Sequence, residues 1–173
     1  MEIVGGRCGE CALPFDKQFC VGWRRGVLKE LINGYKFEAK RAAYFDLAEL
    51  LWVRLGDCSG VKIVPVPTIG RHVRERGFDH IGKICRQLAA LSGGKYVELL
   101  GRNKNTTQVG ASMEKRILQA KEAFCVRKEK ELGGRILLVD DVWTTGSSMK
   151  SACELLKANG ACEISVALLA KSG

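Results

Sequence analysis

Short apolar runs alternate with longer amphipathic stretches along this chain of 173 residues. The runs have the length and the Val, Ile and Leu content of buried strands, and they lie at 61–66, 96–100, 124–126, 136–139 and 164–169. The amphipathic stretches repeat their apolar positions every three or four residues, as helices do, and they lie at 24–56, 80–92, 112–121 and 147–159. This alternation predicts an α/β fold with a parallel sheet flanked by helices.

Turn and cap residues set the expected boundaries of the helices. Asn33-Gly34 is expected to end a first helix at 25–32. An apolar stripe then predicts a second helix that packs on the core, and the stripe consists of Tyr44, Leu47, Ala48, Leu51, Trp52 and Leu55. Asp79 is expected to cap the helix 80–92. The inward face of that helix is expected to carry Ile81, Ile84, Cys85 and Leu88.

The apolar run 136–139 is followed by the stretch with the most specific candidate ligand-binding residues. Two carboxylates follow it, Asp140 and Asp141, and then a loop of small residues made of Thr144, Thr145, Gly146, Ser147 and Ser148. Such a loop at a helix N-terminus is an anion site. Its charge-assisted hydrogen bonds are worth roughly 1.5–3 kcal/mol each, against roughly 0.3–1 for the helix dipole. Carboxylates repel phosphate but accept from sugar hydroxyls, so a ribose 5-phosphate fits both parts.

A second polar loop, 67–78, follows another strand. Pro65 and Pro67 stop that strand and force an extended exit. Three arginines lie between Gly70 and Gly77, and they are Arg71, Arg74 and Arg76. Guanidinium groups match phosphate oxygens in bidentate geometry, so the loop is a candidate cover for a phosphorylated ligand. A solvated basic loop is the alternative.

Other features of this region are interpreted as structural. Gly77 to Lys83 fits most of a Walker A pattern, but Ile84 stands where Ser or Thr would hold magnesium, and no strand precedes it. His72 and His80 lack the spacing of metal ligands. We therefore expect surface or helix-capping roles for both histidines.

The net charge of +9 is uneven along the chain. Residues 71–116 carry 10 Lys and Arg against 4 Asp and Glu, which is two-thirds of the excess. A solvated surface would explain this charge, and so would a polyanionic ligand such as diphosphate or nucleic acid. The sequence has no apolar run of about 18 residues and no leader pattern. We therefore expect a soluble, cytoplasmic protein without membrane insertion.

The eight cysteines fall into two groups. Most occur singly in apolar patterns, as Cys85 and Cys153 do, and are expected in the core. Cys8 and Cys11 have zinc-knuckle spacing, and Cys20 follows nine residues later. A structural zinc site takes four ligands and this stretch supplies three. Zinc binding by Cys8, Cys11 and Cys20 and a degenerate zinc ribbon therefore stay open.

In order and spacing, these motifs resemble a known family. The stretch 136–150 resembles the phosphoribosyl-diphosphate (PRPP) motif of type I phosphoribosyltransferases. With further segments it resembles the ComF family, bacterial phosphoribosyltransferase-like proteins linked to natural competence and DNA uptake. Those segments are Pro65-Val66-Pro67, Arg74–Asp79, Arg102 with Thr107-Gln108, Arg116 and Ala123-Phe124. Two departures are the missing fourth cysteine of the family's zinc element and Ser147-Ser148 in place of the more usual Ala-Thr.

The resemblance implies a type I phosphoribosyltransferase-like parallel sheet for residues 26–173, preceded by a zinc-ribbon-like segment, 1–25. It implies that Asp140 and Asp141 bind the ribose hydroxyls. The 5-phosphate would lie in the loop formed by Val142, Thr144, Thr145, Gly146, Ser147 and Ser148.

The resemblance also assigns the diphosphate side of the site. Pro67 and Thr68 would face the diphosphate, and Arg71, Arg74 and Arg76 would cover it. The implied catalytic residues are Asp140, Asp141, Arg74 and Arg76. Magnesium would bridge diphosphate and ribose oxygens, because Mg²⁺ is usually bound through substrate phosphates.

Two functions remain open at this point. The first is an enzyme that uses Mg²⁺ and PRPP to transfer phosphoribosyl to an unknown acceptor. The second is a non-catalytic accessory protein that senses PRPP, or another phosphorylated ribose, or binds single-stranded DNA and competence proteins. Aromatic residues for base stacking are few in the basic segment, only Phe78 and Tyr96. A homodimer is a further open possibility.

Overall fold

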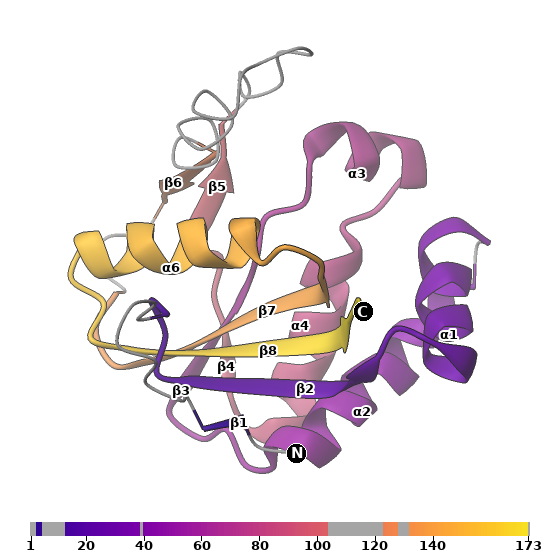
Figure 1. Ribbon diagram of the computed structural model, residues 1–173, viewed down its shortest axis with the longest axis horizontal. Coiled ribbons are helices and arrows are strands. Elements are labelled where there is room, and N and C mark those ends of the chain that lie inside the picture. The colour runs from indigo at the N-terminus through magenta and orange to yellow at the C-terminus, as the bar shows by residue number, and fades with distance from the viewer. Residues whose placement is uncertain (1–2, 5–12, 39, 104–122, 128–131, 173) are drawn as a thin grey trace.

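The computed structural model describes residues 3–4, 13–38, 40–103, 123–127 and 132–172. Within them a central sheet has the strand order β1-β2-β8-β7-β3-β4 (Figure 1). The strands are β1 (Ile3–Val4), β2 (Lys17–Trp23), β8 (Glu163–Lys171), β7 (Arg135–Trp143), β3 (Val61–Pro65) and β4 (Lys95–Tyr96). β1 pairs antiparallel with β2, and every other pairing in this sheet is parallel. The predicted parallel α/β sheet is therefore confirmed.

Helices cover both faces of the sheet. They are α1 (Gly26–Phe37), the 3₁₀ turn η1 (Arg41–Ala43), α2 (Tyr44–Leu55), α3 (Gly70–Arg76), α4 (His80–Ser92) and α6 (Ser147–Ala158). Figure 1 shows α6 on one face, α2 and α4 on the other, and α1 beside the end of β2. The chain enters α6 directly from the end of β7, so the β7–α6 loop lies at the carboxyl edge of the sheet.

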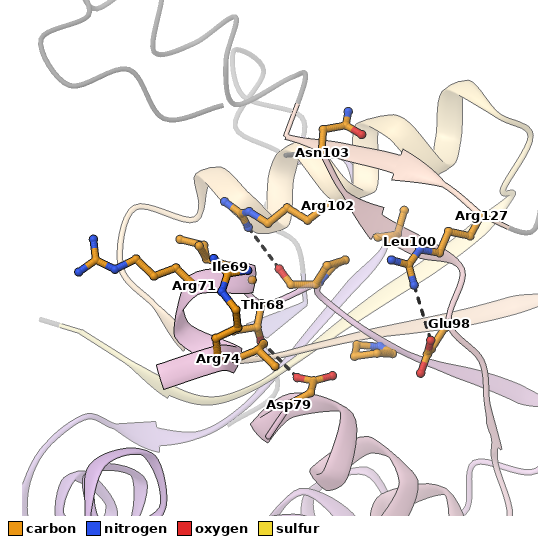
Figure 2. A pocket seen from close by; sticks show the side chains of 14 residues that line it. Thr68, Ile69, Arg71, Arg74, Asp79, Glu98, Leu100, Arg102, Asn103 and Arg127 are labelled. Atoms are coloured by element: carbon orange, nitrogen blue, oxygen red, sulfur yellow. Dashed lines mark hydrogen bonds and ion pairs between the residues drawn. The ribbon is translucent and has the colours of Figure 1, made fainter. Parts of the chain in front are cut away.

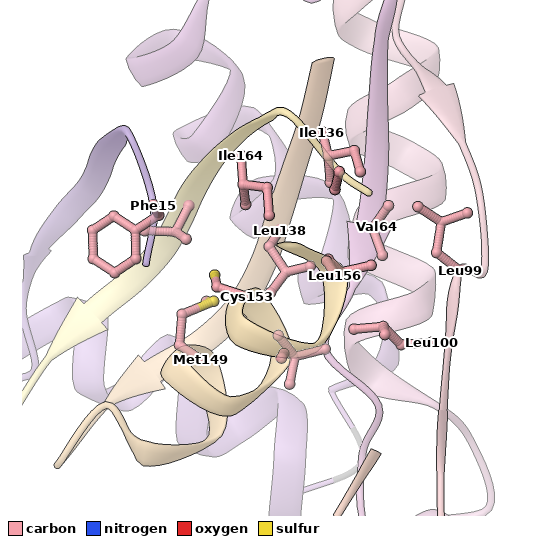
Figure 3. Packing of buried hydrophobic residues seen from close by; sticks show 14 of the residues in the cluster. Phe15, Val64, Leu99, Leu100, Ile136, Leu138, Met149, Cys153, Leu156 and Ile164 are labelled. Atoms are coloured by element: carbon pink, nitrogen blue, oxygen red, sulfur yellow. The ribbon is translucent and has the colours of Figure 1, made fainter. Parts of the chain in front are cut away.

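The strand alternation builds one hydrophobic cluster on each face of the sheet. Ile136 and Leu138 of β7 pack with α6, as Figure 3 shows for Leu138 with Cys153 and Leu156. Leu137 and Val139 of β7 face the opposite cluster, which is formed with α1, α2 and α4. Both faces of the strand are buried, which is why its sequence is apolar without alternation.

The apolar run 96–100 does not form one strand. Its start belongs to β4, which pairs with β3, and its end opens β5 (Leu100–Arg102), which pairs antiparallel with β6 (Phe124–Val126). Val97 and Leu99 lie between them and are buried in the α6-side cluster. The run is apolar because these side chains enter the core, so the prediction of a single strand was wrong.

Two helix predictions also need correction. Helix α1 continues through Asn33-Gly34 to Phe37, because Ile32 and Tyr35 are both buried and extend its apolar face across the expected break. The segment 67–78, predicted as a loop, contains the helix α3. Its left-handed C-terminal residue is Gly77, with φ of +76°. Burial of one face therefore outweighs the turn propensity of Asn-Gly in α1.

Other predictions divide between the described and the undescribed residues. Helices 80–92 and 147–159 are confirmed as α4 and α6, and Asp79 is the N-cap position of α4 although its side chain caps no N–H. Trp52 is 38% exposed, so it is not part of the buried stripe. Residues 17–23, predicted within a zinc-ribbon-like segment, form a strand that runs parallel to β8. The helix predicted at 112–121 lies outside the described residues.

Candidate functional site

The polar loops predicted from the sequence meet at the carboxyl edge of the parallel sheet. Pro67 and Thr68 follow β3, which pairs with residues 135–139 of β7, and Asp140 and Asp141 follow that paired part of β7. Ligands of open α/β sheets bind at this edge. β7 continues past Val139 through Trp143 and pairs with β8. The two carboxylates therefore belong to a strand, and consecutive side chains of a strand point to opposite faces.

Asp141 points to the face that carries α1 and α4, where two cationic or donor groups meet it. His80 Nε2 lies 2.6 Å from Asp141 Oδ2, and Lys36 of α1 forms an ion pair with the same oxygen. Burial disfavours the charged carboxylate, but the hydrogen bond with His80 and the charge of Lys36 outweigh it. The pKa of Asp141 therefore lies below the ordinary range of an aspartate, and the group is ionised.

For Asp140, the effects that raise the pKa outweigh those that lower it. Its withdrawal from water and the neighbouring charge of Asp141 raise its pKa to about 7. The N–H of Asp141 donates to Asp140 Oδ1 at 2.8 Å, and Lys36 and Arg102 act in the same direction, but they do not offset the rise. Perturbed carboxyl groups of this kind are common in binding and catalytic sites.

His80 connects Asp141 with the arginine helix. The side chain of His80 is 4% exposed, and its Nδ1 lies 3.1 Å from Arg76 Nη1 and 3.5 Å from Thr68 Oγ1. The Tyr35 hydroxyl donates to the backbone oxygen of His80 at 3.0 Å. We refer to Lys36, Arg76, His80 and Asp141 as the His80 network. The prediction of a surface or capping role for His80 was wrong, because no local pattern shows which distant residues will surround a buried histidine.

The 144–148 loop lies on the side of the strand to which Asp140 points. It lines a small hollow of about 50 Å³ together with Asp140 and Val142. Gly146 has φ of +74°, and a Cβ there would lie 2.2 Å from the ring of Trp143. Thr145 Oγ1 and Ser147 Oγ are 2.7 Å apart. The tight turn leaves the hydroxyls exposed at the N-terminus of α6, as expected for an anion site.

A larger cleft of about 600 Å³ lies between α3 and the β5–β6 pair (Figure 2), and its lining residue Arg102 interacts electrostatically with Asp140 of the hollow. That volume is typical of small-molecule sites. We call it the arginine cleft, and its charged or hydroxyl-bearing lining residues are Thr68, Arg71, Arg74, Asp79, Glu98, Arg102 and Arg127. Arg102 donates to the Pro67 oxygen at 3.2 Å, and burial lowers its pKa against the opposing charge of Asp140.

The three arginines of α3 have different surroundings. Arg71 and Arg74 line the arginine cleft, whereas Arg76 does not and contacts His80 and the ring of Phe37. Arg71 also pairs with Glu75 one helical turn away, at 2.6 Å. The structure therefore brings Pro67, Thr68, Arg71 and Arg74 to one cleft and Asp140 with the 144–148 loop to a separate hollow. Arg76 and Asp141 both contact His80 and belong to the His80 network.

Some sequence predictions remain untested by this structure. Cys8 and Cys11 lie outside the described residues, as do Thr107, Gln108 and Arg116. Cys20 lies in β2, where its Sγ is 3.3 Å from the Gly22 oxygen. No three His, Cys, Asp or Glu side chains gather in a metal-binding group within the described part of the chain. In that same part, no helix is both long enough and apolar enough to cross a membrane.

Comparison with known proteins points to one family. Residues 38–173 match the family described as "Phosphoribosyl transferase domain". The chain is 31% identical to "Competence protein F" of Haemophilus influenzae, over 99% of this chain and 81% of that protein. It is 30% identical to "DNA utilization protein YhgH" of Escherichia coli, over 96% and 77%, and 23% identical to "Competence protein ComFC" of Streptococcus pneumoniae, over 91% and 72%.

Solved structures show the same fold. The chain matches the allosteric regulatory enzyme of purine biosynthesis with a TM-score of 0.53 and 18% identity, over 72% of this chain and 25% of that one. The glutamine PRPP amidotransferase from B. subtilis gives a TM-score of 0.52 at the same identity and the same coverage. The likeness covers a quarter of each enzyme, and at this identity it concerns the fold alone.

Proposed function

The chain belongs to the phosphoribosyl transferase domain family, and within it to the ComF family of competence-related proteins; from this premise we propose that it binds PRPP with Mg²⁺ and transfers phosphoribosyl to an acceptor. The observation that carries the proposal is that Asp140 and the 144–148 loop line one hollow at the carboxyl edge of the sheet, while Arg102 of the arginine cleft interacts electrostatically with Asp140. The hollow suits a phosphate, the cleft suits a more highly charged group, and the Asp140 carboxyl group of the hollow interacts with Arg102 of the cleft.

The surroundings of each residue suggest its task. The 144–148 loop would bind the 5-phosphate through backbone N–H groups and the hydroxyls of Thr145 and Ser147. Asp140 would accept a hydrogen bond from a ribose hydroxyl. Arg71, Arg74 and Arg102 would neutralise the diphosphate as it leaves the anomeric carbon, which is electrostatic stabilisation of the kind that dominates many enzymes. None of these tasks needs a covalent nucleophile.

Magnesium fits this arrangement as a partner of the ligand. Asp140 has a pKa of about 7 because burial and Asp141 disfavour its charge, and a nearby cation would favour it. Mg²⁺ usually binds through one or two carboxylates plus substrate phosphates. When bound, it would add positive charge to the diphosphate side of the site. Zinc binding at Cys8, Cys11 and Cys20 is a separate proposal, tested by metal analysis of the purified protein.

Calorimetric titration with PRPP, with and without Mg²⁺, tests the proposal. We expect magnesium-dependent binding, and a loss of roughly tenfold or more in affinity for Asp140→Asn, since one hydrogen bond to a charged group is worth roughly 1.5–3 kcal/mol. Asp57→Asn is the matched control, because Asp57 is exposed and precedes β3 at the other edge of the sheet. A folded parent protein that does not bind PRPP would reject the proposal.

A specific observation also favours binding of single-stranded DNA. Aromatic rings and cations meet on the surface beside α1, α2 and α4: Arg76 lies over Phe37, while Lys83 lies over both Phe78 and Tyr44. Phe37 is 68% exposed. Bases stack on such rings with roughly 1–3 kcal/mol each. Relatives named for competence and DNA utilization support this second function.

Oligonucleotide binding at increasing salt tests the second function. Affinity should fall steeply with salt if Arg76 and Lys83 contact phosphates. Phe37→Ser should weaken binding, whereas Val53→Ser should not, because Val53 is a comparably exposed apolar residue of α2 with no ring to stack. Equal binding by both variants would argue against the aromatic surface.

A further inference from the structure

His80 bridges the two parts of the site that the sequence treats as separate. Its Nε2 lies 2.6 Å from Asp141, and its Nδ1 lies 3.1 Å from Arg76. One neighbour belongs to the acidic pair on β7, and the other to the arginine helix α3. The side chain of His80 is buried, so these contacts are made away from bulk water.

The hydrogen-bonding chemistry fixes which nitrogen of His80 carries the proton. An arginine guanidinium only donates, so Nδ1 must accept from Arg76. The other nitrogen, Nε2, then donates to the carboxylate of Asp141, which accepts. Donor and acceptor roles therefore run in one direction from Arg76 through His80 to Asp141.

The position of His80 is itself fixed by the surrounding fold. It is the first residue of α4, and the Tyr35 hydroxyl donates to its backbone oxygen at 3.0 Å. The ring of Tyr35 packs against Phe78, with centroids 5.3 Å apart. Lys36, the next residue of α1, pairs with the same oxygen of Asp141 that faces His80. Two helices therefore hold the same oxygen of Asp141.

We propose that His80 is a positioning residue of the phosphoribosyl site, which fixes the part of β7 that carries Asp140 and Asp141 relative to the arginine helix α3. This inference rests on the proposed function. A ligand with both ribose and diphosphate would contact both segments, through Asp140 on β7 and through Arg71 and Arg74 on α3. His80 itself contacts neither the ligand nor the reacting atoms, so its effect is exerted through Asp141 and Arg76.

Three histidine variants test the role by calorimetric titration with PRPP and Mg²⁺. His80→Phe keeps the ring volume but removes both hydrogen bonds, and it should weaken PRPP binding about tenfold. His80→Gln retains a donor and an acceptor and should restore affinity to within about threefold of the parent. His72→Phe is the matched control, since the chain has two histidines and His72 is not in the network. It should bind as the parent does.

Nitrogen-15 NMR of the imidazole provides a readout that needs no ligand. In a His72→Phe background the single remaining histidine is His80. We expect the pattern of a proton on Nε2 with Nδ1 unprotonated, and a shift of the Nδ1 signal in Arg76→Gln as its donor is lost. A proton on Nδ1, or no response to Arg76→Gln, would overturn the inference, and this measurement does not require His80→Phe to fold.

The outcomes distinguish a failure of the positioning role from a failure of the proposed function. If the parent binds PRPP and a folded His80→Phe binds it equally well, the positioning role is rejected and the proposed function stands. If folded His80→Phe and His80→Gln weaken binding to the same extent, a donor and an acceptor at this position do not restore affinity, and the positioning role is also rejected. If the folded parent binds no PRPP, the proposed function is rejected, and this inference with it.

Discussion

Asp140 and Asp141 are adjacent in the chain, yet the fold treats them in opposite ways. Asp141 has two partners, His80 and Lys36, and its pKa lies below the ordinary range. Asp140 faces the 144–148 loop, and its pKa is raised to about 7 by burial and by Asp141. The strand geometry of β7 causes this difference, because consecutive side chains point to opposite faces.

The comparison extends to the two halves of the site around these residues. The loop half consists of Asp140 and residues 144–148, one short contiguous segment with exposed hydroxyls. The network half is the His80 network, drawn from α1, α3, α4 and β7 and largely buried. The loop half leaves its polar groups available to a ligand, whereas the polar groups of the network half bind one another. The first is suited to binding and the second to positioning.

The largest expected effect comes from breaking the network half at its centre. Asp141→Asn leaves Lys36 and His80 without their buried anion, and removing one partner of a buried pair costs about 3–5 kcal/mol. Asp140→Asn should lower the free energy of unfolding little or even raise it, because the charge of Asp140 is disfavoured in the fold. Urea unfolding at pH 7 measures both. Equal destabilisation by the two variants would contradict the comparison.

The next largest effect concerns the backbone of the loop half. Gly146→Ala places a Cβ at φ of +74° and 2.2 Å from the Trp143 ring. Such strain costs roughly 1–3 kcal/mol, and the loop that would bind phosphate must shift. We expect lower stability and weaker PRPP binding together. Gly133→Ala is the control, because a Cβ there meets nothing within 4 Å. A Gly146→Ala variant with normal affinity would show that the turn is not needed for binding.

The loop half is also the part of the site that the sequence predicts well. Its residues lie within nine positions of one another. A strand, an acidic pair and a turn of small residues follow one another directly, and this local pattern predicts an anion site next to carboxylates. The network half leaves no such pattern. Lys36 and His80 are 105 and 61 residues away from Asp141, and only the packing of α1 and α4 against β7 brings them to it. Their roles could not be derived from neighbouring residues.

The same distinction, between local patterns and contacts made by distant residues, explains which elements of the fold were predicted correctly and which were not. β3, β7, β8, α4 and α6 each bury a continuous apolar pattern, and that pattern predicts them. The errors at Asn33-Gly34 and at 96–100 occur where burial by distant elements decided the local structure, through Tyr35 in one case and Val97 with Leu99 in the other. Local propensity is a weak prior against tertiary packing.

A smaller effect is expected in the pH dependence of stability. The pKa of Asp140 in the folded protein, about 7, exceeds its ordinary value of 3.8, so the native state binds more protons than the unfolded chain between these values. Its contribution to stability therefore decreases as the pH rises toward 7. For Asp141 the pKa is lowered, so its contribution is present above the ordinary carboxyl range and is lost as the pH falls below it.

Unfolding free energies of the parent and Asp140→Asn, measured from pH 5 to pH 8, test this directly. The stability of Asp140→Asn relative to the parent should increase over that range by on the order of 2–3 kcal/mol, since about two pH units lie between pH 5 and the raised pKa and each corresponds to about 1.4 kcal/mol. Asp57→Asn should show no such trend, because Asp57 is exposed and its pKa is lowered by hydrogen bonds with Ser59. A flat difference for Asp140→Asn would mean that its carboxyl is not disfavoured in the fold.

The smallest effect separates two arginines that the sequence presents alike. Arg71 is exposed and forms an ion pair with Glu75. The motion of its exposed side chain and this ion pair both reduce what Arg71 contributes to the free energy of ligand binding. Arg76 faces His80 in the network half, so its position is fixed before a ligand arrives. We expect Arg71→Gln to weaken PRPP binding about twofold and Arg76→Gln about tenfold, as measured by calorimetry. If Arg71→Gln weakened PRPP binding more than Arg76→Gln, exposed charge on α3 would matter more for affinity than preorganisation. The result would then contradict a role of the network half in binding.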